Sequence, residues 1–379
     1  MNVLICALDS PGFLYQSIGL AKVLEQGGHR VACVSSASVA DVFERYGVTR
    51  IPRPGTDGPS FVIAKWGTVE ATLLQFLHVM HAAKSVRPDV IVASALGKGP
   101  ALAAERLGVP LVTIGGLTFL WEPGSWRHDE SWTSFLAARR ALRLPLPSEA
   151  ARREFPPWLG GSFLLQSSAS LTGPLRWPQC SWVGDASWDP PSRDDGLSSW
   201  LDATARRGRR IVYLQTGREF GRRSVLDMLE EPARRLDLAF VVATAHSDRE
   251  RTRTEDSLWA RPFVPRAAVL PRCSLVVGAG HPTTVLGALT HGRPLVLLSN
   301  GSGTEESAEA CQRAGVAITA RLTEATPSGL GALLTRAFGD EAMRRAAAAI
   351  GADLRSRGGL ATVAGIVAGA NPSSMRATV

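Results

Sequence analysis

Short runs of Val, Ile, Leu and Ala alternate with helix-like segments, and this alternation constrains the fold more than any other feature of the chain. In the first half, strands are expected at 3–8, 29–35, 86–94 and 109–116. Helices are expected between them, at 13–27 and 99–108. The strand segments are apolar along most of their length, so both of their faces should be covered. The pattern predicts a parallel sheet with helices on both faces.

The alternation restarts after the Pro- and Asp-rich segment DASWDPPSRDD. Further strands are expected at 209–217, 238–245, 273–280 and 293–300, with helices at 283–291 and 305–314. We therefore predict an α/β protein with two doubly wound, Rossmann-like domains and a ligand-binding cleft between them. The expected boundaries are 1–183 for the N-terminal domain, 184–196 for a linker, 197–370 for the C-terminal domain and 371–379 for a disordered tail.

The composition argues against several classes of partner. The net charge is +8, but nearly all basic residues are arginines, which are interleaved with acids along the chain. This distribution is typical of a solvated surface, so we expect no nucleic-acid partner. No uncharged apolar stretch reaches the roughly 18 residues of a membrane span, so no membrane partner is expected. The first residues resemble a buried strand rather than a leader, which favours a cytoplasmic location.

Metal and cofactor motifs are also missing from the sequence. The five cysteines are scattered, and none has the spacing of a metal ligand set: Cys6, Cys33, Cys180, Cys273 and Cys311. We expect reduced, buried thiols and no metal site. No GxGxxG or Walker-type loop is present, which disfavours dinucleotide and ATP chemistry.

Three loops that follow C-terminal strands have the composition of an anion-binding turn. They lie at 215–218, 278–284 and 300–306. Glycine permits close approach of the backbone, and a helix N-terminus presents free amides to an anion. The loop at 278–284 is the most informative, because Thr283 and Thr284 stand where the next helix begins. An ordinary capped helix is the alternative interpretation of the same residues.

The order of these segments resembles the nucleotide-sugar-dependent glycosyltransferases that decorate natural products, which have the two-domain GT-B fold. The helix and Gly-His-x-Val of GFLYQSIGLAKVLEQGGHRV (12–31) match the opening of that family. The segment FVPRAAVLPRCSLVVGAGHPTTVLGALTHGRPLVLL (263–298) is similar to its donor-binding motif. PDVIVASALGKGPALAAERLGVPLV (88–112) and IVYLQTG (211–217) also match.

The resemblance implies a donor site for a UDP- or dTDP-linked sugar, used as a co-substrate and not as a cofactor. By matching, Phe263 stacks on the nucleobase and Arg266 lies near the base or ribose. The residues implied around the diphosphate are Gly217, Arg218, Gly280, His281, Thr283 and Thr284. Thr304 and Glu305 fall at or next to the positions that usually hold sugar hydroxyls. A surface arginine is the alternative interpretation of Arg218.

Several positions depart from the family pattern. Phe13 replaces the histidine that usually deprotonates the acceptor, and Ser94 replaces its orienting aspartate. Gly278 replaces a phosphate-binding histidine, and Gly303-Thr304 replaces the usual Asp-Gln pair. Three explanations stay open. The acceptor needs little base catalysis, or the base has moved to Asp9 or to His128 or Asp129, or the protein binds without catalysing. A structural loop cap is the alternative interpretation of Asp9.

The expected acceptor site lies in the N-terminal domain. Its candidate residues are Ser10, Gly12, Phe13, Trp66, Trp121, Trp126 and His128. Tryptophans suit a flat or apolar acceptor, although a packed core explains them equally well. We predict an inverting, metal-independent transfer of a sugar, such as a deoxy or amino sugar, to a small natural product. The alternatives are a catalytically silent partner protein and a nucleotide-sugar epimerase. The sequence leaves a homodimer open.

Overall fold

The computed structural model describes residues 1–53, 55, 58–117, 126–149, 154–191, 196–216, 226–244, 253–299 and 304–370, with only the backbone of 126–128 and 324. The chain divides into two compact units. The N-terminal unit comprises Met1–Gln166, Pro174–Trp188 and the segment that begins at Gly358. The C-terminal unit comprises Ser167–Gly173 and Asp189–Arg357.

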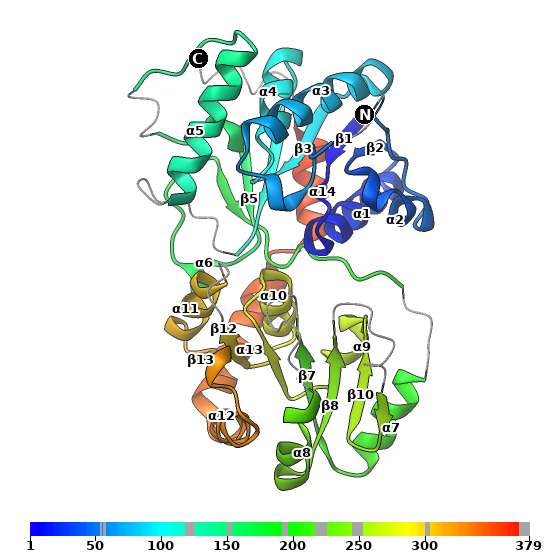
Figure 1. The fold of residues 1–379 in the computed structure, drawn as a ribbon, viewed down its shortest axis with the longest axis vertical. Helices are drawn as coiled ribbons and strands as arrows, with labels where there is room; N and C mark the ends of the chain where they lie inside the picture. Colours follow the sequence, from blue (N-terminus) through cyan, green and yellow to red (C-terminus); the bar gives the residue numbers. More distant parts are fainter. Residues whose placement is uncertain are drawn as a thin grey trace. The chain divides into compact units, whose positions relative to one another are not determined.

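The N-terminal unit contains a six-stranded parallel sheet with the order β2-β1-β3-β4-β5-β6 (Figure 1). Its strands are β1 (Asn2–Cys6), β2 (Arg30–Val34), β3 (Val90–Ser94), β4 (Leu111–Gly115), β5 (Ser162–Leu165) and β6 (Cys180–Trp182). Successive β1 residues enter different cores. Leu4 and Cys6 join one buried cluster, whereas Val3 and Ile5 join another. The sheet is therefore buried on both faces, as its continuous apolar strands predicted.

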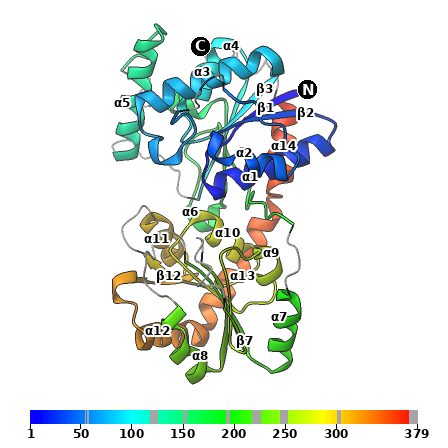
Figure 2. The same ribbon diagram turned by 45° about the vertical axis from the view of Figure 1, so that its right-hand side comes forward.

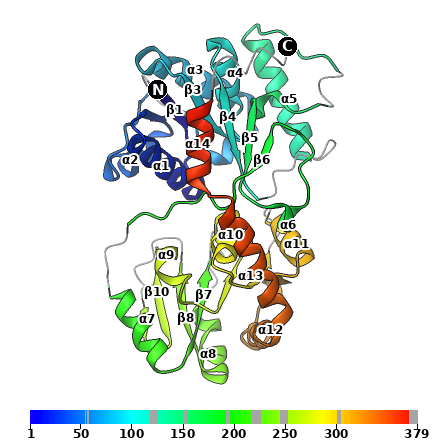
Figure 3. The same cartoon turned by 180° about the vertical axis from the view of Figure 1, so that it is seen from behind.

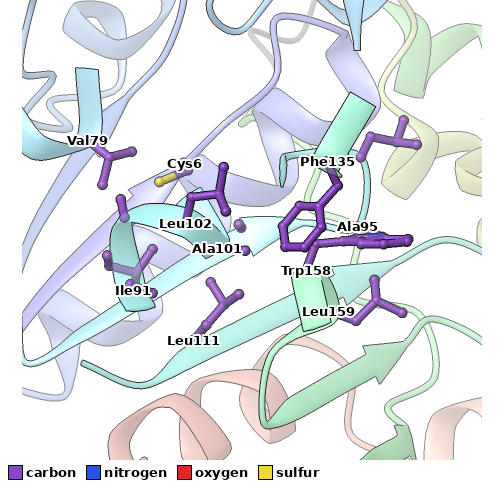
Figure 4. Packing of buried hydrophobic residues seen from close by; sticks show 14 of the residues in the cluster. Cys6, Val79, Ile91, Ala95, Ala101, Leu102, Leu111, Phe135, Trp158 and Leu159 are labelled. Carbon is purple, nitrogen blue, oxygen red and sulfur yellow. The ribbon is translucent and has the colours of Figure 1, made fainter. Parts of the chain in front are cut away.

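Helices cover the two faces of this sheet (Figures 2 and 3). They are α1 (Pro11–Gln26), α2 (Ala40–Arg45), α3 (Val69–Val86), α4 (Lys98–Leu107), α5 (Trp126–Ala141) and α14 (Leu360–Gly369), with short 3-10 turns at η1 (Ala37–Val39), η2 (Ile63–Lys65) and η4 (Pro157–Leu159). Figure 4 shows one core, where Val79 of α3 and Leu102 of α4 pack with side chains of the sheet. Phe135 and Trp158 extend that core, their ring centroids 5.2 Å apart.

The C-terminal unit contains a seven-stranded sheet with the order β13-β12-β11-β7-β8-β10-β9. Its strands are β7 (Arg210–Gln215), β8 (Leu238–Ala243), β9 (Arg253–Glu255), β10 (Leu258–Arg261), β11 (Leu275–Gly278), β12 (Leu295–Ser299) and β13 (Ala317–Arg321). All neighbours are parallel except β9 and β10. The helical elements are α6 (Ala169–Thr172), α7 (Leu197–Arg206), η6 (Leu226–Met228), α8 (Glu230–Leu236), α9 (Arg266–Val269), α10 (Pro282–Thr290), α11 (Glu305–Arg313), η8 (Leu322–Glu324), α12 (Pro327–Gly339) and α13 (Glu341–Ser356).

The predicted α/β class and both parallel sheets are confirmed, but the units differ from the expected ranges in two places. Helix α14 packs against α1 in the N-terminal unit, although 197–370 was expected to form one domain. Its Val363 and Val367 are fully buried in a core of that unit. The segment Ser167–Gly173 belongs to the C-terminal unit, within the range expected for the N-terminal domain.

The segment expected to be a linker is anchored where it is described. Ala186 is fully buried, and Trp188 lies against Gly19 and the rings of Tyr15 and Tyr46. Residues 192–195 and the predicted tail 371–379 lie outside the described residues.

All five cysteines are buried and free, as predicted. Within the described part of the chain, no helix is both long and apolar enough to cross a membrane.

Candidate functional site

Two neighbouring strands of the C-terminal unit end together at the loop that was expected to hold the diphosphate. Gly278, the last residue of β11, pairs in register with Gln215, the last residue of β7. The chain then turns at Gly280, whose φ of +99° strongly favours glycine. Helix α10 follows, with His281 as its N-cap and Pro282 in its first turn. The amide end of a nine-residue helix therefore lies at the carboxyl edge of the sheet.

A second helix N-terminus approaches the same turn. A Cβ atom at Gly280 would lie 3.0 Å from the carbonyl oxygen of Thr304, which precedes α11. The Thr304 side chain is buried, and its Oγ1 has no hydrogen-bond partner among the described residues. The amides of Gly280 and Thr283 likewise donate to no described residue. We call Gly280, Thr283 and Thr304 the amide cradle, because these two amides and one hydroxyl donate to no other described residue, as donors that bind an anion would.

The two threonines of the loop differ in their engagement. Thr284 is buried, and its Oγ1 donates a 2.7 Å hydrogen bond to Oε1 of Gln215. This bond ties the start of α10 to the end of β7, so the donor capacity of that hydroxyl is already used. The half-buried Thr283 makes no such side-chain bond to a described residue. Of the two predicted phosphate ligands, the geometry thus favours Thr283.

Arg266 was expected near the base or ribose, and the structure places its guanidinium in an internal ion pair. Nη2 lies 2.6 Å from Oδ1 of Asp189, and Nε donates to the same oxygen at 2.9 Å. Nη1 donates to the carbonyl oxygen of Thr283 in the first turn of α10. The other carboxylate oxygen of Asp189 accepts from the amide of Ala267. Arg266 therefore links α9 and α10 to Asp189, the first residue of the unit's long segment.

Phe263 has the exposure that a base-stacking residue needs. It lies between β10 and α9, and half of its surface is accessible. Large exposed hydrophobic side chains are rare in the described residues, the others being Leu77 and Leu146. A half-exposed aromatic ring at this place, between β10 and α9, can stack on a nucleobase.

Other predicted site residues fall outside this description or at the start of α11. Gly217, Arg218 and Trp121 are not among the described residues, and nothing is known of the side chains of Trp126 and His128. Glu305 is the first residue of α11, next to the buried Thr304. Its carboxylate therefore belongs to the helix end that borders the amide cradle.

In the N-terminal unit, Asp9 is a loop anchor. Its Oδ1 accepts a 2.8 Å hydrogen bond from the amide of Ile63, and its own amide donates to the carbonyl oxygen of Phe61. The neighbouring Ser10 is the N-cap of α1, and its carbonyl oxygen accepts from the amide of Phe13. Gly12 lies in the first turn of this helix. These contacts favour the loop-cap interpretation of Asp9.

Replacing Asp9 with asparagine separates the two interpretations. An amide oxygen still accepts from Ile63, so an anchoring role predicts that D9N keeps at least half of the parent kcat. A general base predicts a loss of about 100-fold or more, because asparagine cannot take a proton. Initial rates of sugar transfer, with circular dichroism as the folding control, distinguish the outcomes.

At the position where the resembled family usually has a catalytic histidine, this chain has the apolar residue Phe13. Phe13 lines a small pocket together with Cys6, Ile114, Ser17 and Ser94 at the carboxyl edge of the sheet. Ser94 is buried, and its Oγ accepts from the amide of Leu96. Neither Phe13 nor Ser94 is a base at neutral pH, as the sequence indicated.

A buried lysine that the sequence analysis did not single out lies beside a predicted acceptor residue. Lys98 is 1% exposed, and its Nζ donates to the carbonyl oxygen of Trp66 at 3.2 Å. The same Nζ lies 4.6 Å from the centroid of the Trp66 ring. Burial lowers the pKa of Lys98 to about 8, while the charge of Glu130 acts in the opposite direction. One sequence signal could have drawn attention to Lys98: it is one of few lysines in the chain, and it lies in an apolar segment.

Two other tryptophans of the middle region are core residues. Trp132 and Trp158 are buried and pack edge to face, with ring centroids 4.9 Å apart. They stabilise the contact between α5 and η4. The described residues hold no cluster of three or more His, Cys, Asp or Glu side chains able to bind a metal ion.

Comparisons with known proteins agree with this geometry. Residues 227–368 match the family model of the erythromycin biosynthesis protein CIII-like C-terminal domain. The chain is 27% identical to a UDP-N-acetylglucosamine–N-acetylmuramyl-(pentapeptide) pyrophosphoryl-undecaprenol N-acetylglucosamine transferase of Symbiobacterium thermophilum, over 93% of this chain and 91% of the relative. It is 36% identical to a 3-alpha-mycarosylerythronolide B desosaminyl transferase of Saccharopolyspora erythraea, over 27% of this chain and 25% of the relative.

A solved structure has the same fold over nearly the whole chain. The glycosyltransferase VinC, in complex with dTDP, superposes with a TM-score of 0.74 and 19% identity, over 99% of this chain and 100% of VinC. The fold is therefore GT-B. In sequence the chain is similar to glycosyltransferases, and its residues 227–368 are similar to the C-terminal domain of an erythromycin biosynthesis protein.

Proposed function

We propose that this protein transfers a deoxy or amino sugar from a nucleoside-diphosphate sugar to a small natural-product acceptor. The acceptor's nucleophilic atom attacks the anomeric carbon, and the bond from that carbon to the diphosphate oxygen breaks with inversion; the proton of the nucleophilic atom passes to water or to the departing diphosphate. The nucleoside diphosphate leaves with the bonding electrons, and its new charge needs stabilisation by fixed donors. The N-terminal unit binds the acceptor. A cytoplasmic location and a homodimer remain predictions.

The amide cradle carries this proposal. It offers two backbone amides and one buried hydroxyl, at Gly280, Thr283 and Thr304, to a diphosphate. Such donors stabilise a leaving diphosphate without a metal ion, because the helix N-termini supply the positive potential. The dTDP complex of VinC, a protein of the same fold, supports dTDP as the first ligand to test.

The sugar is inferred from the residues at the start of α11. Thr304 is buried beside the turn, and Glu305 brings a carboxylate where sugar hydroxyls are usually held. A carboxylate pairs well with the ammonium group of an amino sugar. Mass spectrometry of products from a panel of dTDP- and UDP-sugars tests this assignment. Plain UDP-glucose as the best donor would contradict it.

Phe263 provides a second test of the donor site. Replacing it with alanine removes the exposed ring, and base–aromatic stacking contributes about 1–3 kcal/mol. We expect the Kd of dTDP to rise at least 10-fold in F263A and little in F263W. Isothermal titration calorimetry measures both variants. L77A, which removes another exposed hydrophobic side chain, is the matched control and should leave the Kd unchanged.

A catalytically silent binding protein is the second candidate function. It is favoured by the apolar surroundings of Phe13 and by the engagement of Asp9 with Ile63. Tight dTDP binding with no product from any oxygen, nitrogen or carbon acceptor would support it. Turnover with any of these acceptors would exclude it.

A further inference from the structure

The charge of Lys98 is not neutralised by the described protein. An ammonium group has three N–H donors, and the described residues accept from one of them, through the carbonyl oxygen of Trp66. No described carboxylate lies within ion-pair distance of Nζ. Glu130 on α5 is near enough to act on Lys98 electrostatically, but it forms no ion pair with it. A buried charge with so few partners is costly.

The position of Lys98 in its helix increases this cost. Lys98 is the first residue of α4, where the free amides of a helix already create a positive potential. Close packing fixes the residue there, because Gly99 lies directly against the backbone of α3 at Thr72. The amide of Gly99 donates to Oε1 of Gln75 on α3. The residue that carries the ammonium is therefore fixed at a helix end whose amide potential disfavours a cation.

The cover over Lys98 belongs to one anchored loop. Trp66 follows η2 and is half-buried, with its ring over Nζ. The loop is tied to β1 through the hydrogen bonds between Asp9 and the backbone of Ile63 and Phe61. Gly67, the next residue of this loop, lies directly against the carboxylate of Glu130. The Trp66 ring thus lies over the ammonium of Lys98 and is itself partly exposed, so a planar ligand can reach this ring.

We propose that Lys98 binds the carboxylate of an aromatic acceptor, which takes the place of the Trp66 indole over the ammonium. This deepens the proposed function, because it rests on the N-terminal unit as the acceptor-binding unit. The carboxylate supplies the acceptor oxygens that the ammonium lacks, and the displaced indole stacks on the aromatic ring of the ligand. The charge of Glu130 opposes the bound carboxylate to some extent and disfavours a second anionic group more strongly, because the single ammonium is then already paired.

The test uses 2-naphthoate and its neutral analogue 2-naphthamide as probes. The sequence contains four lysines, so protein labelled with ¹⁵N at Nζ gives few NMR signals, and K98R assigns the relevant one. We expect 2-naphthoate to raise the pKa of Lys98 by at least one unit, and 2-naphthamide to leave it unchanged. Affinity for 2-naphthoate should fall as the pH rises above about 8, where the free ammonium loses its proton.

Calorimetry on two methionine variants completes the test. K98M should weaken 2-naphthoate binding at least 10-fold, whereas K65M, which changes an exposed lysine of the same loop, should not. Equal 2-naphthoate affinity in K98M and the parent, or an unmoved Lys98 signal, would overturn the proposal. Both variants should bind dTDP normally, so loss of the carboxylate site is distinguishable from failure of the donor site.

Discussion

Replacing Arg266 with alanine should lower the free energy of unfolding of the C-terminal unit by about 3–5 kcal/mol. The substitution leaves the carboxylate of Asp189 without its main partner at a position where only 17% of the side chain is exposed. It also removes the donor to the Thr283 carbonyl oxygen and opens space beside Gly287. Urea denaturation followed by circular dichroism gives the value.

A surface ion pair of the same unit provides the control for Arg266. Arg272 lies 3.6 Å from Asp202, and both side chains are largely exposed. R272A should therefore cost less than about 1 kcal/mol. The double variant R266A/D189A should recover part of the loss, because the unpaired carboxylate is gone. If R266A costs no more than R272A, the ion pair does not organise the start of α10.

The Gly280→Ala variant should bind dTDP at least 100-fold more weakly than the parent, a loss of about 3 kcal/mol. A methyl group at this position meets the carbonyl oxygen of Thr304 at 3.0 Å, and alanine rarely adopts a φ of +99°. The turn must therefore shift, which moves the amides of Gly280 and Thr283 from their present positions. Calorimetry with dTDP measures the loss.

Gly339→Ala is the matched control for this substitution. Gly339 ends α12, and a Cβ atom there meets nothing within 4 Å. G339A should leave both dTDP affinity and stability nearly unchanged. Parent-like dTDP affinity in a folded G280A protein would show that the amide cradle is not part of the donor site.

The sequence predicted the positions of helices and strands better than it predicted which of them pack against each other. Strands such as β3 and β12 were predictable because every residue except the last is buried and apolar. The periodicity of α14 shows which of its faces is buried, but not which sheet or helix covers it. Its packing against α1 depends on contacts between segments more than 300 residues apart.

For the candidate site, the sequence indicated where the backbone turns but not which partners the side chains have. Glycine at position 280 and threonine at 283 predicted an anion-binding turn, and this role stays a prediction; the amides of both residues donate to no described backbone carbonyl. The roles of Arg266 and Lys98 depend on Asp189 and Trp66, which are distant in sequence. Local sequence contains no signal for such pairings, because arginine and lysine are usually solvated.

The division of the chain between its two units also limits how this protein can be recombined with its relatives. The backbone passes from one unit to the other four times, at 166–167, 173–174, 188–189 and 357–358. In a hybrid of two homologues joined at one point near residue 190, α1 and α6 would come from one parent and α13 and α14 from the other. Helix α1 would then pack against the α14 of another protein, and α13 against the α6 of another protein. Exchange of acceptor preference between homologues therefore requires grafting three separate segments, with the final helix kept beside its own first helix.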